Sequence, residues 1–558
     1  MKRTRLLSLP FAAALALGHG ATALADDARR PSTIAAEPGG LDPNPAEADP
    51  PNVVETIEGN SPARAPQPEA PVAPRPAVSE PLAGSQRAPE NKVQEPASRF
   101  ELAGWARQAL EVGLWKRSAG AGDPAPDLPY NQLVARTQLF LRARYSRANW
   151  FEANVSGALS YSVFEQQPLP ERGGFNGFNG QRTLGLLEPH LHELFVGFFS
   201  RRLDVRIGQQ RLAWGNSDFA SPNDVMNARD LRDPFLSEAE LRYVPTFLLR
   251  ADLDLGFASV QAVLEPVFTP DRYDVYGSNW AAIQPDAPRW ASALVGIARG
   301  SIDPSLEQPA QRMLAATRYP ASDFSQPVPG ARFSWSAQGV DMSYYYQYGF
   351  DGPLVAIDPA LSGTLSRPGA GPAGLSDLQP LFAAIDAGQE PLRVYYVRRH
   401  HVGLDVGTTL GQVALRVDAA YDSQRVFYRT DLNSALSPAF AGVVSVEYQT
   451  GHTDRQALLE ALYFRIMNPP ASRLLVYERD TLAVAANFRW PLWRWFGVGL
   501  RALAYPKPRS LVMQPELETK LGAWVISVGG LWLDGDAYSF GRHFQRNTEG
   551  YARVKVLF

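Results

Sequence analysis

The sequence predicts an all-β fold, a transmembrane antiparallel up-and-down β-barrel of about 18 strands (roughly 16–18) with long extracellular loops. Three observations predict it. Apolar and polar side chains alternate along many segments after residue 100, short and long connections interleave, and the final stretch, YARVKVLF, alternates and ends on Phe558. The chain divides into a signal peptide (1–25), a proline-rich, disordered periplasmic linker (26–98) and the barrel (99–558).

The first 25 residues have the pattern of a secretory signal peptide. A basic start, MKRTR, precedes the apolar stretch LLSLPFAAALALG, and Ala23-Leu24-Ala25 forms a cleavage site before Asp26. Export and a location in the bacterial outer membrane are therefore expected. Cysteine is absent, which excludes disulfides and a lipid-anchored cysteine.

Charge and hydropathy exclude other classes of protein. A formal net charge of −3, from 54 basic and 57 acidic residues, gives no field that would attract nucleic acid. Beyond the signal peptide, no apolar run approaches the roughly 18 residues that a membrane-spanning helix needs. The 12 Trp, 21 Tyr and 27 Phe fit a β protein, either periplasmic or in the outer membrane.

Between residues 26 and 98 the chain has fifteen prolines and no aromatic residue. Such a segment cannot bury enough apolar surface to offset its conformational entropy, so it is predicted to be disordered and partly polyproline II. Two interpretations stay open for this arm. It is either a solvated tail or a tether that reaches the cell wall or a periplasmic partner.

After Phe100 the strands follow one another with period two. In FEANVSGALSYSV, which starts at Phe151, the apolar residues share one face and the polar residues share the other. The preceding run puts three arginines opposite its leucines, and a turn around Arg147 joins the two runs. A dry core would leave these arginines without partners, whereas a wet lumen would solvate them. The pore-lining residues are predicted to be Arg136, Arg142, Arg144, Glu152, Arg206, Gln210, Arg332, Arg416, Asp418 and Arg489.

Connection lengths give an independent signal. Short turns are expected near residues 147, 200, 255, 339, 410 and 493, and long connections over 166–185, 215–242, 269–330 and 351–391. Short turns at one end and long loops at the other are typical of outer-membrane barrels, and a sandwich gives no reason for this order. Helices are expected within PSLEQPAQRMLAAT and LSDLQPLFAAIDAG of the two longest loops.

The most distinctive segment is DVRIGQQRLAWGNSDFASPNDVMNARDLRDPF. Its residues Gly208, Gln210, Trp214, Gly215, Asp224, Asn227 and Asp230 fit the pattern G-x-Q-x-x-x-W-G followed by D-x-x-N-P-x-D. In this the chain resembles a family of uncharacterised proteobacterial outer-membrane barrels, which are porin-like. It departs from the pattern at Ala228, where the family usually has proline. The resemblance implies a barrel that moves small molecules and does not identify the solute.

The polar loop within this segment has two interpretations. In one it folds into the mouth and constricts the pore; in the other its charges pair locally and hold an extracellular cap. The predicted constriction residues are Trp214, Asp218, Asp224, Asn227, Arg229 and Asp230. His190 and His192 share a strand face, but their spacing alone does not predict a metal site.

The favoured function is a porin-like channel that lets small solutes pass passively through a polar lumen gated by extracellular loops. One alternative is a structural or docking barrel that acts through its proline-rich arm. A rim hydrolase is disfavoured, because no G-x-S-x-G and no compact Ser–His motif occurs. No cofactor or metal is expected. The expected partners are outer-membrane lipid, an unidentified small solute and, because a terminal strand ending in Phe558 resembles its recognition signal, the barrel assembly machinery.

Overall fold

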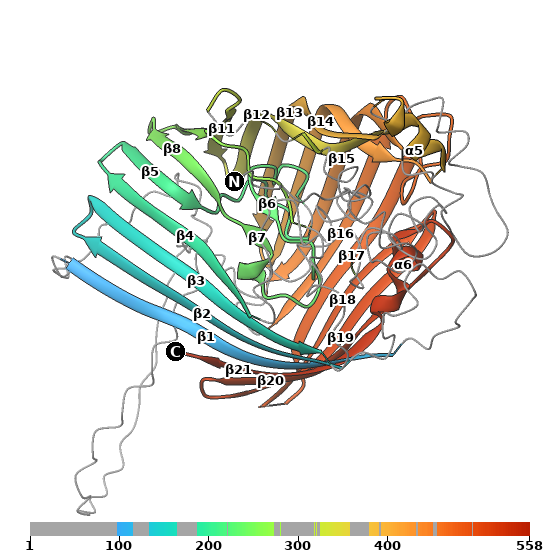
Figure 1. Ribbon diagram of the computed structural model, residues 1–558. Helices are drawn as coiled ribbons and strands as arrows, with labels where there is room; N and C mark the ends of the chain where they lie inside the picture. The colour runs from blue at the N-terminus through green and yellow to red at the C-terminus, as the bar shows by residue number, and fades with distance from the viewer. Residues whose placement is uncertain are drawn as a thin grey trace, which may run out of the picture.

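The computed structural model describes residues 98–114, 133–164, 187–219, 221–272, 280, 317–318, 320, 324–357, 379–389, 392–430, 433–449, 455–493 and 495–558. The expected signal peptide, almost all of the expected linker and the helix expected near residue 310 lie outside these residues. Within them, 18 antiparallel strands close into a barrel, as expected (Figure 1). No helix of the described part is long and apolar enough to cross a membrane.

The strands follow chain order around the ring. They are β1 (Ser98–Gly113), β2 (Leu133–Arg147), β3 (Phe151–Phe164), β4 (Leu187–Phe199), β5 (Leu203–Gln210), β8 (Thr246–Asp254), β9 (Ala258–Glu265), β11 (Val328–Ala337), β12 (Val340–Ile357), β13 (Leu392–Leu410), β14 (Val413–Tyr428), β15 (Ser434–Gln449), β16 (Gln456–Ile466), β17 (Asp480–Pro491), β18 (Phe496–Pro506), β19 (Arg509–Leu521), β20 (Trp524–Gly535) and β21 (Glu549–Leu557).

Short elements lie in the connections. They are β6 (Ala228–Arg229), β7 (Tyr243–Val244), the 3-10 helices η3 (Ala239–Leu241) and η6 (Gln545–Asn547), β10 (Thr317–Arg318), α5 (Gln379–Asp386) and α6 (Phe540–His543). The helix expected in LSDLQPLFAAIDAG is thus confirmed as α5. β6 pairs with β7, and β10 lies parallel to β13.

The barrel closes where the first strand meets the last. β1 pairs with β21 from Trp105–Leu557 to Gly113–Glu549, and Phe558 exchanges two backbone hydrogen bonds with Gly104 (2.8 and 3.1 Å). A Cβ at Gly104 would lie 2.3 Å from a carbonyl oxygen of β2 and 3.0 Å from the Phe558 ring. Only glycine gives the terminal ring this close approach.

Side chains alternate across the wall as the sequence predicts. On β3, Val155, Leu159 and Tyr161 are 40–44% exposed on the outside, whereas Glu152 and Asn154 are buried on the inside. Exposed aromatic residues also gather at the short turns: Trp150, Phe257, Trp493, Trp495 and Trp524. An apolar outer band with an aromatic girdle fits a barrel that meets lipid.

The connections separate into a short-turn end and a long-loop end, with two departures from the expectation. β18 and β19 meet through two residues at the long-loop end. The loop expected from Asp351 begins later, because β12 continues to Ile357. A bulge after Asp351 shifts the register against β13 and accommodates Gly352 (φ +133°) and Pro353 within the strand.

Candidate functional site

The connection between β5 and β8, residues 211–245, folds into the lumen; we call it the lumen loop. Figure 1 shows its paired strands β6 and β7 inside the ring. Its apolar side chains Trp214, Phe219, Met226, Phe235 and Leu236 are all at most 2% exposed. The lumen loop is therefore a packed part of the barrel interior.

Two glycines let the lumen loop leave the wall. Gly208 bends β5 with φ +134°, and a Cβ there would lie 2.3 Å from the carbonyl oxygen of Leu194. The Trp214 indole then donates a 2.7 Å hydrogen bond to Gln261 of β9. It lies against Gly330 of β11, where a Cβ would come within 2.7 Å of the indole ring.

One end of the lumen loop is held by two buried carboxyl groups, which we call the carboxyl anchor. Asp418 of β14 and Glu460 of β16 are both 0% exposed. Each accepts three hydrogen bonds from the loop, at 2.5–3.2 Å. The donors are Ser217 Oγ, Ser221 Oγ and the backbone N–H groups of Asn216, Ser217, Asp218 and Phe219. Most of these donors are backbone groups that otherwise would be buried without partners.

The other end is held by charged pairs, which we call the ion-pair anchor. Arg136 of β2 pairs with Asp233. Glu238 pairs with Lys555 of β21 at 2.7 Å and with Arg107 of β1 at 3.2 Å. All five side chains are at most 20% exposed, so water screens these pairs only in part.

The two anchors lie on opposite walls. Arg416 of β14 pairs with Asp218 beside the carboxyl anchor, and Arg136 of β2 pairs with Asp233 in the ion-pair anchor. β2 is second and β14 eleventh in the ring of 18, so the same number of strands separates them in either direction. The lumen loop therefore spans the barrel from one side to the other.

The charges of the ion-pair anchor are stabilised in their ionised forms. Burial alone would raise the pKa of Asp233, but the Arg136 guanidinium outweighs burial and holds this pKa below its ordinary value. Burial likewise opposes ionisation of Glu238, and Lys555 together with Arg107 holds its pKa far below the ordinary range. Both acids are thus ionised, and paired, at neutral pH.

Between the anchors, Asp224 organises the lumen loop. Its carboxylate pairs with Arg229 at 3.0 Å and accepts a 3.0 Å hydrogen bond from the Tyr243 hydroxyl. Asn227 bonds both backbone groups of Leu212 and so ties the two ends of this stretch together. Ala228, where the related pattern has proline, is 6% exposed and pairs with Val244 in the β6–β7 ladder.

A third set of contacts ties the loop to β4. Arg232 pairs with Asp230 at 2.6 Å and with Glu188 of β4 at 2.7 Å. Backbone hydrogen bonds join the loop to Arg272 in the segment that follows β9. Burial opposes ionisation of Asp230, but Arg232 and Arg272 lower its pKa below the ordinary value.

Near the ion-pair anchor, aromatic rings connect the lumen loop to the β20–β21 connection. Phe235 contacts Trp280 and Phe540 of α6, with ring centroids 5.3 and 6.1 Å apart. Trp280 in turn contacts Phe544 at 5.3 Å. This aromatic cluster fills interior space that water would otherwise occupy.

The structure places the predicted residues in two groups. Arg136, Arg416, Asp418 and all six predicted constriction residues hold or build the lumen loop, whereas Gln210 donates to the Leu248 carbonyl on the wall. The others bond along the wall: Arg144 pairs with Glu152 (2.8 Å), Arg206 with Glu152 (3.7 Å) and Arg489 with Glu518 (3.6 Å). Arg142 lies over the Phe140 ring and Arg332 is partly buried on β11.

Sequence reasoning missed Glu460, Arg107 and Tyr345. The Tyr345 hydroxyl accepts a hydrogen bond from the Gly215 backbone at 3.1 Å. Glu460 did leave a signal, because it is the one charged residue within the apolar run ALLEALYF. No group of three or more His, Cys, Asp or Glu in the described ranges is arranged to hold a metal.

A family model described as "Protein of unknown function (DUF1302)" matches residues 175–493. This range contains the whole lumen loop and the carboxyl anchor. No curated protein matches the chain in sequence.

Solved structures similar to the chain include several outer-membrane proteins. Pseudomonas aeruginosa OccK5 (OpdH) is 7% identical, covers 82% of this chain and 97% of its own, and has a TM-score of 0.40. Salmonella typhi OmpF in complex with daunomycin is 9% identical, covers 83% of this chain and 98% of its own, and has a TM-score of 0.38. Acinetobacter baumannii OccAB4 is 7% identical, covers 84% of this chain and 99% of its own, and has a TM-score of 0.42.

Proposed function

The chain belongs to the family described as protein of unknown function (DUF1302), and we propose that it is a porin-like outer-membrane channel through which small solutes pass passively. The lumen loop is the constriction of this channel. The observation that carries the proposal is the placement of its two anchors on opposite walls. A loop held at both ends across a lumen narrows it without depending on its own stiffness.

The two arcs of wall on either side of the loop differ, and this difference indicates where solutes pass. Toward β8–β12 the loop packs into an apolar cluster with the wall: Leu212, Trp214, Met226, Leu248, Val263 and Tyr345. Toward β17–β19 the inward residues near the short-turn end are polar: Asn487, Arg489, Arg501, Gln514, Glu516 and Glu518. Charged side chains of both signs suit a wet passage for hydrophilic solutes, and we place the route along this arc.

Planar bilayers test the channel directly. The purified full chain is expected to produce discrete single-channel steps in KCl, because the polar residues of β17–β19 would line a water-filled route. Variants in which the lumen loop is released from the wall should give larger single-channel conductance steps with more noise. A folded barrel that inserts into bilayers and yields no steps would contradict the proposal.

The same proposal includes export through the N-terminal segment, and it treats a tethering role of the proline-rich arm as the alternative to be tested. Deleting residues 26–97 separates the arm from the channel. If the barrel alone is the channel, single-channel steps survive the deletion. If the arm acts as a tether, the deletion abolishes binding of the protein to the cell wall or to a periplasmic partner.

A further inference from the structure

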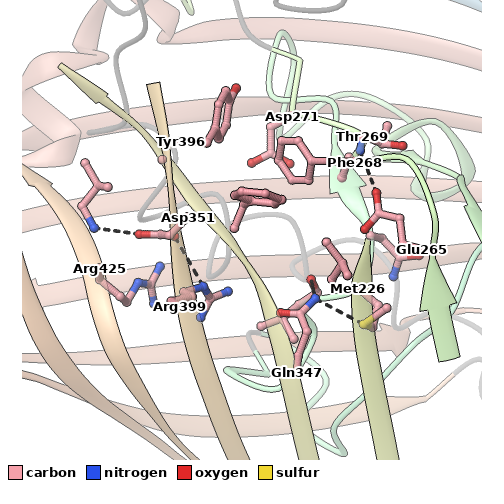
Figure 2. A pocket seen from close by; sticks show the side chains of 17 residues that line it. Met226, Glu265, Phe268, Thr269, Asp271, Gln347, Asp351, Tyr396, Arg399 and Arg425 are labelled. Carbon is pink, nitrogen blue, oxygen red and sulfur yellow. Dashed lines mark hydrogen bonds and ion pairs between the residues drawn. The ribbon is translucent and has the colours of Figure 1, made fainter. Parts of the chain in front are cut away.

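A pocket lies above the apolar cluster, between the lumen loop and the long-loop ends of β9, β12, β13 and β14 (Figure 2). Its water-accessible volume is about 70 Å³. One water needs roughly 10–15 Å³ on the same measure, so the pocket has room for several waters or a small organic group. None of the residues of the carboxyl anchor or the ion-pair anchor lines this pocket.

One side of the pocket holds two guanidinium groups, and these cations are already paired. Figure 2 shows Arg399 and Arg425 on one side with Asp351. Arg399 pairs with Asp422 and lies 3.9 Å from Asp351, and Arg425 lies 3.6 Å from Asp422. Two carboxylates thus balance two guanidinium groups on this side, which leaves no excess positive charge for an anion.

The facing side carries two further carboxyl groups, from Glu265 and Asp271. Their hydrogen bonds come from neutral backbone N–H groups, of Thr269 at 2.6 Å and Arg229 at 2.7 Å. Glu265 is 4% exposed. Burial raises the pKa of Asp271 to about 6, and the nearby Arg229 offsets only part of this rise.

An unpartnered acceptor points to a ligand as well. Gln347 is 3% exposed, and its side-chain N–H₂ is committed to the Val225 carbonyl at 3.0 Å and the Met226 sulfur at 3.2 Å. These bonds fix the orientation of the amide and leave Oε1 buried without a partner. A buried acceptor in this state calls for a donor, which a ligand in the pocket would supply.

Aromatic rings complete the lining. The Phe268 ring contacts Phe350 and Tyr396, each with centroids 5.0 Å apart. Ring faces attract cations, and their apolar surface accepts hydrocarbon. Carboxyl groups, an amide oxygen and aromatic rings around one space are the chemistry that recognises an organic ammonium group.

We propose that this pocket binds the ammonium group of a small organic cation, with Glu265, Asp271 and Gln347 Oε1 accepting its hydrogen bonds and the Phe268 ring against its hydrocarbon part. As a site on the transport route, the pocket rests on the proposed channel function and assigns small organic amines as the solute class. As a binding site, it is supported by the contacts described above, independently of transport.

Calorimetry on the full chain in detergent micelles tests the site with three probes of equal shape: benzylammonium, benzyl alcohol and benzoate. Benzylammonium is expected to bind roughly tenfold more tightly than benzyl alcohol, because only the cation gains from the carboxyl groups and the ring. Benzoate should bind most weakly. Equal binding of all three probes, or tightest binding of benzoate, overturns the proposal without any variant.

The double variant Glu265→Gln, Asp271→Asn is expected to lose the preference for benzylammonium and to bind benzyl alcohol as before. Asp480→Asn, which removes a carboxylate at the outer rim, should leave all three affinities unchanged. An unchanged benzylammonium affinity in the double variant overturns the site. Single-channel steps without a benzylammonium preference overturn this inference and leave the channel standing; the preference without steps supports the pocket and contradicts the channel.

Discussion

The two ends of the lumen loop are fixed to the wall by different chemistry. At the carboxyl anchor, Asp418 and Glu460 are fully buried and accept mostly backbone N–H groups, whose positions are set by the chain itself. At the ion-pair anchor, Glu238 and Asp233 meet long, flexible, partly exposed cations. Burial makes the first anchor insensitive to salt and costly to disturb, whereas the second responds to ionic strength and pH. The same loop therefore has one permanent and one adjustable attachment.

Replacing Glu460 is expected to have the largest effect. Glu460→Leu leaves Ser217 Oγ, Ser445 Oγ and two backbone N–H groups buried without an acceptor. The cost to loop docking is on the order of 4 kcal/mol, because each buried donor left without an acceptor costs about 1–3 kcal/mol. Single-channel conductance should rise and become noisy, and trypsin should cleave within residues 211–245.

Glu460→Gln retains one carbonyl acceptor and should give an intermediate effect. Asp480→Leu removes a carboxylate from the outer rim and serves as the control, with unchanged conductance and protease resistance. Wild-type behaviour of Glu460→Leu would mean that the carboxyl anchor does not hold the loop.

The ion-pair anchor is expected to weaken by less. Asp233→Asn removes one of two carboxylate partners of Arg136, the other being Glu111 of β1 at 3.5 Å. The cost is about 1–2 kcal/mol, because Arg136 and Asp233 are both partly exposed. Raising KCl from about 0.1 to 1 M shortens the screening length from roughly 10 to 3 Å and should add open-channel noise in the wild type. That added noise should be smaller in Asp233→Asn, because this variant has already lost one of the three pairs of the anchor and retains the two pairs of Glu238.

The fold was largely predictable from the sequence, because period-two alternation and connection length are local properties of the chain. The alternation predicted the faces of β2 and β3 correctly, and the strand count agrees with the closed ring. It failed at Asp351, where glycine and proline suggested a loop end but a bulge keeps both inside β12. Local turn chemistry does not distinguish a bulge from a strand end.

The path of the lumen loop was not predictable in the same way. The sequence showed a charged loop and left open whether it constricts the mouth or pairs its charges locally to hold an extracellular cap. The answer depends on pairs such as Arg416 with Asp218, which lie 198 residues apart in the chain. Periodicity gives the face of a residue, but it does not give its partner across the lumen. The residues around Asp224 do pair locally, so both kinds of contact are present.

Acid should weaken the ion-pair anchor. The pKa values of Asp233 and Glu238 are lowered on folding, so both acids contribute stability above their ordinary pKa, about pH 4, and this stability is lost as pH falls through their lowered values. The conductance noise should therefore increase as pH falls below about 4, where the ion-pair anchor loses its charged pairs.

Asp271 has the opposite effect on how the stability of the fold depends on pH. Its pKa is raised to about 6, so its contribution to stability is present below about pH 4 and is lost as pH rises through 6. Thermal unfolding of Asp271→Asn should lack this part of the pH dependence and match the wild type elsewhere. For the ion-pair anchor, conductance noise that stays unchanged as pH falls from about 4 to about 2 would contradict the assignment of Asp233 and Glu238.

The smallest effect is expected on ion selectivity. Its measurement distinguishes the polar arc of β17–β19, where solutes are proposed to pass, from the arc of β8–β12, against which the lumen loop packs. Arg489 and Arg501 lie on the polar arc, whereas Arg136 is committed to the ion-pair anchor. The double variant Arg489→Glu, Arg501→Glu removes positive charge where ions are proposed to pass, so the reversal potential in a KCl gradient should shift toward cations. Arg465→Glu makes the same kind of charge change on the outer face and should leave that potential unchanged. Because the two anchors are untouched, the constriction keeps its shape, and an unchanged potential in the double variant would mean that ions follow another arc.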